Sequence, residues 1–251
     1  MAKITWDADG ERRYETGCDH GVLYPKQETA KYYTKATLGN LSNETADVSD
    51  TTKRGTKFYN GVAWNGLVSV SENPSGADAN DLWADNIKYA SIRSAESFAA
   101  TIEAYMYPDE FLPCDGCKVV GGVIIHQQER LPFGFSFRSD IGVDADAAVD
   151  KDKKYKIHII YNATASPSSR QFSTINESPD AITFSYEITT TPISAGSGYK
   201  PVSILTVDST KVADPTKLET LEKALYGDAE NDNNEYKYLP MPEDILAFFH
   251  A

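Results

Sequence analysis

The chain has 251 residues, of which 41% are apolar, and 37 acidic residues outnumber 24 basic ones to give a net charge of −13. This length suits one large domain, or a domain with appended arms. The acidic balance argues against nucleic acid as a specific ligand, because binding to phosphates needs clustered Lys and Arg.

The N-terminal residues contain no apolar run that would serve as a signal peptide. No later segment approaches the roughly 20 apolar residues that cross a bilayer. The most apolar short stretch, residues 119–125, has the length of a strand and contains two glycines. We therefore expect no membrane contact and a protein that is made and assembled in the cytoplasm.

Thr34–Lys57 is a long polar segment in which only three large apolar residues stand out, namely Leu38, Leu41 and Val48. Loops of this length inside a compact domain are usually functional or disordered. We therefore expect this segment to be a functional or disordered loop and not part of the core.

Residues 61–76 form an apolar strand that runs into a polar turn. Pro74 fixes φ and Gly76 permits a positive φ, so the strand is predicted to stop there. The apolar side chains of the strand are Trp64, Leu67, Val68 and Val70.

Four later segments alternate apolar and polar residues with a period of two: residues 98–106, 133–141, 155–161 and 182–188. This period indicates strands with one buried and one wet face, as in antiparallel sheets. The wet faces carry Glu103, Glu187 and His158, and we expect His158 at the surface. The predicted fold is mostly β, an antiparallel β-sandwich or barrel.

One packed helix is predicted over residues 214–227. Asp214 suits the N-cap, Pro215 the first helical position, and Gly227 the end. The apolar stripe of this helix consists of Leu218, Leu221, Ala224 and Leu225.

An acidic spacer, residues 228–235, separates a β-domain of residues 1–227 from a C-terminal arm. The arm holds a short helix predicted from Glu243. It either folds back on its own core or docks on a neighbouring subunit. Its candidate contact residues are Tyr236, Tyr238, Leu239, Met241, Ile245, Leu246, Phe248 and Phe249.

Cys114 and Cys117 are spaced like half a zinc site, which Cys18 and His20 would complete. The alternative is a tight turn between strands with incidental thiols that can oxidise to a disulfide.

Asp144 and Asp146 suggest calcium, but no twelve-position calcium loop is present, and adjacent carboxylates in turns are more often solvated. The four histidines show no catalytic spacing. We therefore predict no catalytic, cofactor-binding or metal-binding residue, and no enzyme.

The turn segment 61–76 resembles the opening signature of the major tail proteins of long-tailed bacteriophages of Gram-positive hosts. Further segments similar to that family follow in the same order along the chain. They are residues 82–89, 104–111, 132–138, 161–167, 176–187, 207–211 and 239–245.

The resemblance implies a tail-tube β-sandwich subunit that forms hexameric rings, which stack into the tail tube of the virion. Its partners would be identical copies, the tape measure, the tail terminator and the distal tail protein. Genomic DNA would pass through without specific binding, and Glu103 and Glu187 are candidates for the lining of the lumen. The long loop and terminal arms would contact neighbouring rings.

The alternative function is a β-sandwich module of a phage tail that binds carbohydrate on the host surface. Its 15 Tyr and 10 Phe could supply a platform for stacking sugars. At strand spacing, such aromatic residues are more often part of the core.

Overall fold

The computed structural model describes residues 13–25, 32–33, 45–46, 61–76, 78–143, 154–172, 174, 181–227 and 238–250. Its helices are the short 3-10 helix η2 (Asp109–Phe111), α1 (Pro215–Tyr226) and α2 (Pro242–His250). Its strands are β1 (Arg13–Pro25), β2 (Tyr32–Tyr33), β3 (Thr45–Ala46), β4 (Val62–Ala63), β5 (Leu67–Glu72), β6 (Ser75–Gly76), β7 (Ala79–Ala84), β8 (Ile87–Arg93), β9 (Glu96–Ser97), β10 (Ala99–Ala104), β11 (Lys118–Val120), β12 (Val123–Ile125), β13 (Phe133–Val143), β14 (Lys154–Ala165), β15 (Phe184–Thr190) and β16 (Ile204–Asp208).

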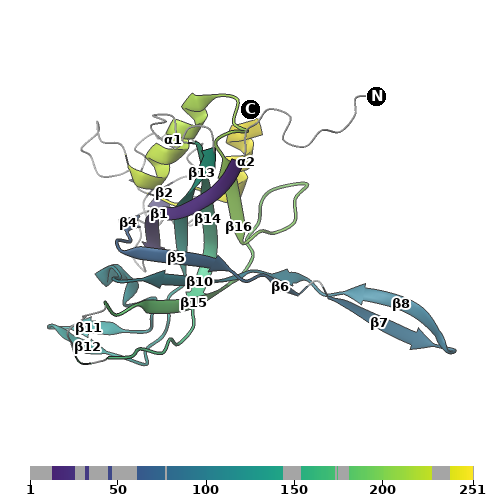
Figure 1. Ribbon diagram of the computed structural model, residues 1–251, viewed down its shortest axis with the longest axis horizontal. Coiled ribbons are helices and arrows are strands. Elements are labelled where there is room, and N and C mark those ends of the chain that lie inside the picture. The colour runs from purple at the N-terminus through teal and green to yellow at the C-terminus, as the bar shows by residue number, and fades with distance from the viewer. Residues whose placement is uncertain are drawn as a thin grey trace.

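The body of the molecule is one antiparallel sheet with the strand order β4-β1-β13-β14-β15-β10-β5, in which β14 also pairs with β16. The long strand β14 is the branch point, because residues 156–160 pair with β16 and residues 163–165 pair with β15. The sheet thus folds over itself, and β5, β10 and β15 run across β13 and β14 in Figure 1. The predicted mostly-β, antiparallel fold is confirmed.

The main core lies between the two layers of the folded sheet and is rich in aromatic rings. Trp64 is at its centre, with ring centroids 4.7 Å from Phe111 and 5.5 Å from Phe135. The Trp64 backbone N–H donates to the carbonyl oxygen of Gly21 at 2.8 Å, which ties the β4–β5 connection to β1. Many of the aromatic residues on the strands therefore serve as core.

A second core lies between the other face of the sheet and the two helices. Helix α1 forms as the sequence predicts: the Asp214 carboxylate accepts the backbone N–H of Thr216 at 3.0 Å, Pro215 opens the helix, and Gly227 follows it with φ 97°. Leu221 and Leu225 of this helix are fully buried against the sheet.

His158 corrects the prediction of a surface residue, because it is only 9% exposed. Its ring stacks on Phe137 with centroids 4.5 Å apart, and its nitrogens lie 3.0 Å from Ser139 Oγ and 3.3 Å from Thr206 Oγ1. The alternation in β14 was identified correctly, but this strand lies in the middle layer, where both of its faces are covered. Burial lowers the pKa of His158, although the nearby carboxylates of Glu15 and Glu72 oppose that shift.

The C-terminal segment folds back on its own chain, so the structure has the first of the two predicted alternatives. Leu239 and Ile245 are each 2% exposed and belong to the second core. The Tyr238 backbone N–H donates to the Ala224 carbonyl at 2.9 Å, and the Tyr161 hydroxyl donates to the Pro240 carbonyl at 3.0 Å. The acidic spacer between α1 and this segment lies outside the described residues.

Among the described helices, none has the length and apolar character needed to cross a membrane.

Candidate functional site

A long two-stranded ribbon is the most prominent feature outside the body. Strands β5 and β10 end at the body, and pairing then resumes as β6–β9 and β7–β8 well beyond it (Figure 1). The predicted end of a strand before Pro74 is correct, but the chain continues outward there instead of turning back. Gly76 has φ 90°, and a Cβ at this position would overlap the carbonyl oxygen of Ala95, so the connection requires glycine.

The outer ribbon, β7–β8, reverses direction at Asp85 and Asn86, whose φ values are 50° and 61°. Positive φ at both central residues is the backbone geometry of the tight turns that match the twist of a hairpin. This ribbon was not predicted from the sequence. The available signal was the Asp-Asn pair between two short segments that carry apolar residues, Leu82 and Ala84 before it and Ile87 and Tyr89 after it.

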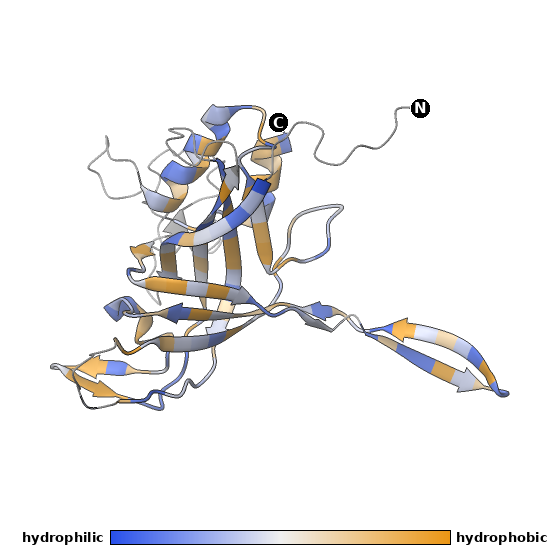
Figure 2. Cartoon of the chain, viewed as in Figure 1, coloured by the Kyte–Doolittle hydropathy of each residue, from blue (hydrophilic) through white to orange (hydrophobic). Residues whose placement is uncertain are grey.

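The register of the β7–β8 ribbon gives it one apolar and one largely polar face. Cross-strand pairs Leu82–Ala90 and Ala84–Ile87 share a face with Ile92. Leu82, Ile87 and Ile92 are 41%, 62% and 57% exposed. Figure 2 shows these strands with orange segments far from the core. Side chains on one face of a two-stranded ribbon have no second layer to cover them.

The opposite face of the same ribbon is stabilised by polar contacts around Asp81. The Asp81 carboxylate lies 2.8 Å from Lys88 Nζ and accepts the hydroxyl of Ser91 at 2.8 Å. Trp83 also belongs to this face by register, and Tyr89 lies at a shift in the register; they are 68% and 73% exposed. These contacts hold the ribbon's geometry without covering its apolar face.

A second exposed ribbon, β11–β12, is built from the apolar stretch 118–125. Gly121 and Gly122 form its turn with φ 58° and 84°. Val119 pairs with Ile124, and Val120 pairs with Val123, so both faces carry apolar side chains. All four are between 43% and 62% exposed. This ribbon and β7–β8 lie at opposite ends of the molecule (Figure 1).

Glu103 and Glu187 lie on one outward-facing side of the three-stranded layer β5–β10–β15. Thr101 pairs with Glu187 and Glu103 pairs with Ser185, while the alternate residues Ala100, Ile102 and Ala104 face the core. The Glu103 carboxylate accepts the hydroxyl of Ser69 at 2.8 Å. The sequences of these strands contain no Lys or Arg, so this face is built from hydroxyls and carboxylates. We call it the acidic face.

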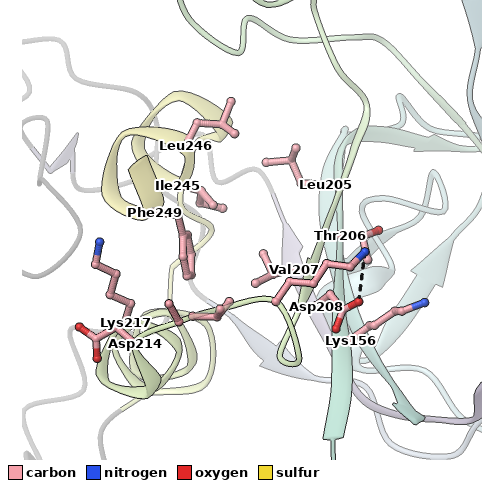
Figure 3. A pocket seen from close by; sticks show the side chains of 13 residues that line it. Lys156, Leu205, Thr206, Val207, Asp208, Asp214, Lys217, Ile245, Leu246 and Phe249 are labelled. Atoms are coloured by element: carbon pink, nitrogen blue, oxygen red, sulfur yellow. Dashed lines mark ion pairs between the residues drawn. The ribbon is translucent and has the colours of Figure 1, made fainter. Parts of the chain in front are cut away.

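A cavity of about 590 Å³ lies between α2 and β16 (Figure 3). Leu246 and Phe249 of α2 line one side and Leu205 and Val207 of β16 line the other. Lys217 crosses between the helices and donates from Nζ to the Phe248 carbonyl at 3.1 Å. Among the described strands, β16 pairs only with β14, so its other edge faces no described strand.

The residues predicted to contact other subunits lie in different environments. Tyr238, Leu239 and Ile245 are buried in their own subunit and are not available to a neighbour in this conformation. Met241, Leu246, Phe248 and Phe249 are partly exposed. Leu38, Leu41, Val48 and Tyr236 lie outside the described residues, as does most of Thr34–Lys57.

The cysteine pair forms a tight turn. Cys114 and Cys117 are 0% and 4% exposed, and Cys117 Sγ lies 3.1 Å from His126 Nδ1. Burial raises the pKa of Cys114 to about 12. Cysteine binds a metal as the thiolate, which a raised pKa disfavours. In the described ranges, no three His, Cys, Asp or Glu side chains lie close enough together to hold a metal ion. Cys18 and His20 thus do not complete the predicted zinc set, and the calcium candidates Asp144 and Asp146 lie outside the described residues.

No protein-family model matches this chain, and no curated protein matches it in sequence.

Proposed function

We propose that this protein is the subunit of a hollow tube, as the resemblance to the major tail proteins of long-tailed bacteriophages implies. Identical copies form rings, six-fold in that family, and the rings stack into a conduit for DNA. Such a protein is a structural component of a virion and performs no catalysis. The observation that carries the proposal is the β7–β8 ribbon with its bare apolar face.

The ribbon argues for a partner surface on energetic grounds. A two-stranded ribbon alone is marginally stable in water, and a third strand or a packed layer is needed to stabilise it. Full burial of one Leu or Ile side chain contributes about 1.5–3 kcal/mol. Covering Leu82, Ile87 and Ile92 would therefore contribute several kcal/mol per subunit, repeated at every contact in a ring or stack.

The acidic face supports the second part of the proposal, a bore through which DNA passes. Phosphates are bound by Lys and Arg, and each such contact releases counterions and adds affinity. A lining made of Ser, Thr and Glu gives the DNA backbone no cationic partner. Over many stacked rings even a weak attraction at each would accumulate, so a surface of this composition suits passage rather than retention.

Strand β16, whose outer edge faces no other described strand, fits the same function. An unpaired edge strand invites pairing with other chains, and closure between identical copies removes that hazard. The half-buried Leu246 and Phe249 beside β16 are then candidates for a second contact between subunits. The tape measure, the tail terminator and the distal tail protein would meet the inside and the two ends of the finished tube.

Electron microscopy of the purified full-length chain over a range of concentrations tests the proposal. We expect rings or tubes of uniform bore. The variant Ile87→Asn/Ile92→Asn should lose assembly while keeping its far-UV circular dichroism and melting temperature. The matched control Lys88→Asn/Ser91→Asn changes the polar face of the same ribbon and should still assemble, because an exposed ion pair such as Lys88–Asp81 contributes little.

A monomer that shows no assembly at any soluble concentration and binds glycans on an array would contradict the tube. That result would support the alternative, a carbohydrate-binding module.

A further inference from the structure

In the part of the chain that the structure describes, two exposed ribbons, β7–β8 and β11–β12, both carry apolar side chains but differ in how these are arranged. The β7–β8 ribbon has one apolar face, in which the small Ala84 and Ala90 lie beside the larger Leu82 and Ile87. The β11–β12 ribbon is apolar on both faces. Single exposed apolar residues are ordinary, but contiguous apolar patches on a protein surface mark sites of interaction.

The two ribbons project from opposite ends of the molecule (Figure 1), so one copy cannot bring its own pair together without unfolding the body. For the two different surfaces to cover each other, the copies must be arranged head to tail. Such a heterologous contact closes into a ring or continues as a helical stack, whereas contacts between identical patches end at a dimer.

We propose that the apolar face of β7–β8 in one copy packs against β11–β12 of the next copy. This inference rests on the proposed function and names the two surfaces that join in it. Because Ala84 and Ala90 are smaller than Leu82 and Ile87, the β7–β8 face would present recesses beside the larger side chains. Branched side chains such as Val120 and Val123 have the size to fill those recesses, as facing layers do when they interdigitate.

Cysteine cross-linking of the full-length chain tests this pairing. Ile87 and Val123 are each 62% exposed, so either position can be changed with little effect on folding. Ile87→Cys protein is mixed with Val123→Cys protein and oxidised, and each variant is also oxidised alone. The matched control mixes Ile87→Cys with Tyr199→Cys, which is 52% exposed and lies beside His250 of α2. Electron microscopy of the same samples records whether tubes form.

We expect a covalent dimer and a weaker monomer band in the Ile87→Cys and Val123→Cys mixture, with neither variant alone nor the control mixture giving the dimer. A double variant carrying both cysteines should give a ladder of higher oligomers. Tubes that form without this cross-link would overturn the pairing and leave the proposed function intact. A dimer from Ile87→Cys alone would also overturn it, because the ribbon would then pair with itself. Neither tubes nor cross-links would overturn both the pairing and the proposed function.

Discussion

Leu239→Ala is the substitution that best distinguishes between a C-terminal segment that packs on its own subunit and one that packs on a neighbouring subunit. Leu239 is 2% exposed, and its side chain fills the space above Gly134 in β13. Ile245 and Leu221 belong to the same cluster. Truncation of Leu239 would leave a cavity that the rigid strand below cannot close.

The expected loss follows from that burial. Replacing a buried Leu by Ala lowers the free energy of unfolding by about 2–5 kcal/mol. Domains of this kind are stable by about 5–15 kcal/mol, so the variant should fold but with a clearly lower urea midpoint. Leu246→Ala is the matched control from the same C-terminal segment. Leu246 is only half-buried at the edge of a cavity, so its loss should stay near 1 kcal/mol.

Urea unfolding followed by tryptophan fluorescence, to which the buried Trp64 contributes, measures both variants. The prediction holds if Leu239→Ala loses more stability than Leu246→Ala while the denaturant slope stays constant. Equal stability of the two variants, with assembly lost only in Leu239→Ala, would refute the reasoning. The C-terminal segment would then contribute its apolar side chains to another subunit and not to its own core.

Three further predictions address the pH response, the lumen and the fit of the C-terminal segment. The pKa of His158 is lowered in the folded state from about 6.5, so the unfolded chain binds the proton more readily and the free energy of unfolding should fall as the pH drops below about 6.5. In His158→Gln, the part of this fall that comes from His158 should disappear from the pH dependence of the urea midpoint. The same pH dependence in the variant and the parent chain would contradict the prediction. In assembled tubes, Glu187→Cys should resist a bulky polymer maleimide that labels it in the monomer, whereas Glu219→Cys on α1 should be labelled in both; equal labelling in the tubes would place the acidic face outside. A Cβ at position 134 would overlap the side chain of Leu239, so Gly134→Ala should destabilise the chain by roughly 1–3 kcal/mol and lose less when Leu239 is already Ala; additive losses in urea unfolding would mean that the two positions do not touch.

Local rules explain what the sequence predicted well. Helix α1 was predictable because its signals lie within the helix itself: the Asp214 cap, Pro215 at the first position and Gly227 at the end. The alternation in β10 and β15 correctly placed Glu103 and Glu187 on the wet side of the sheet. One face of that layer meets the core while the other carries the acidic residues, as a period of two requires.

Nonlocal packing explains what the sequence could not predict. His158 is buried because β14 is the middle layer, and only the arrangement of β5, β13 and the helices around it decides that. The β7–β8 ribbon was missed for a different reason. Leu82 pairs with Ala90 and Trp83 pairs with Lys88, so Tyr89 is an extra residue in β8. The alternation of apolar and polar residues is broken there. The Cys114 and Cys117 spacing left half a zinc site and a tight turn as alternatives, because Cys18 and His20 are distant in sequence and only the fold shows that no metal cluster forms among the described residues.

The distribution of apolar surface within the chain gives the strongest argument for assembly. The C-terminal segment shows that this fold can recruit a distant piece of chain to bury Leu239 and Ile245. Yet Ile87 and Val123 stay 62% exposed on ribbons that extend away from the body. Uncontrolled aggregation is the usual consequence of bare apolar strands. Separation of the two ribbons at opposite ends, with the Asp81–Lys88 pair along one of them, restricts association to a defined geometry. Exposed apolar surface confined in this way is expected of a subunit whose folding is completed by its neighbours.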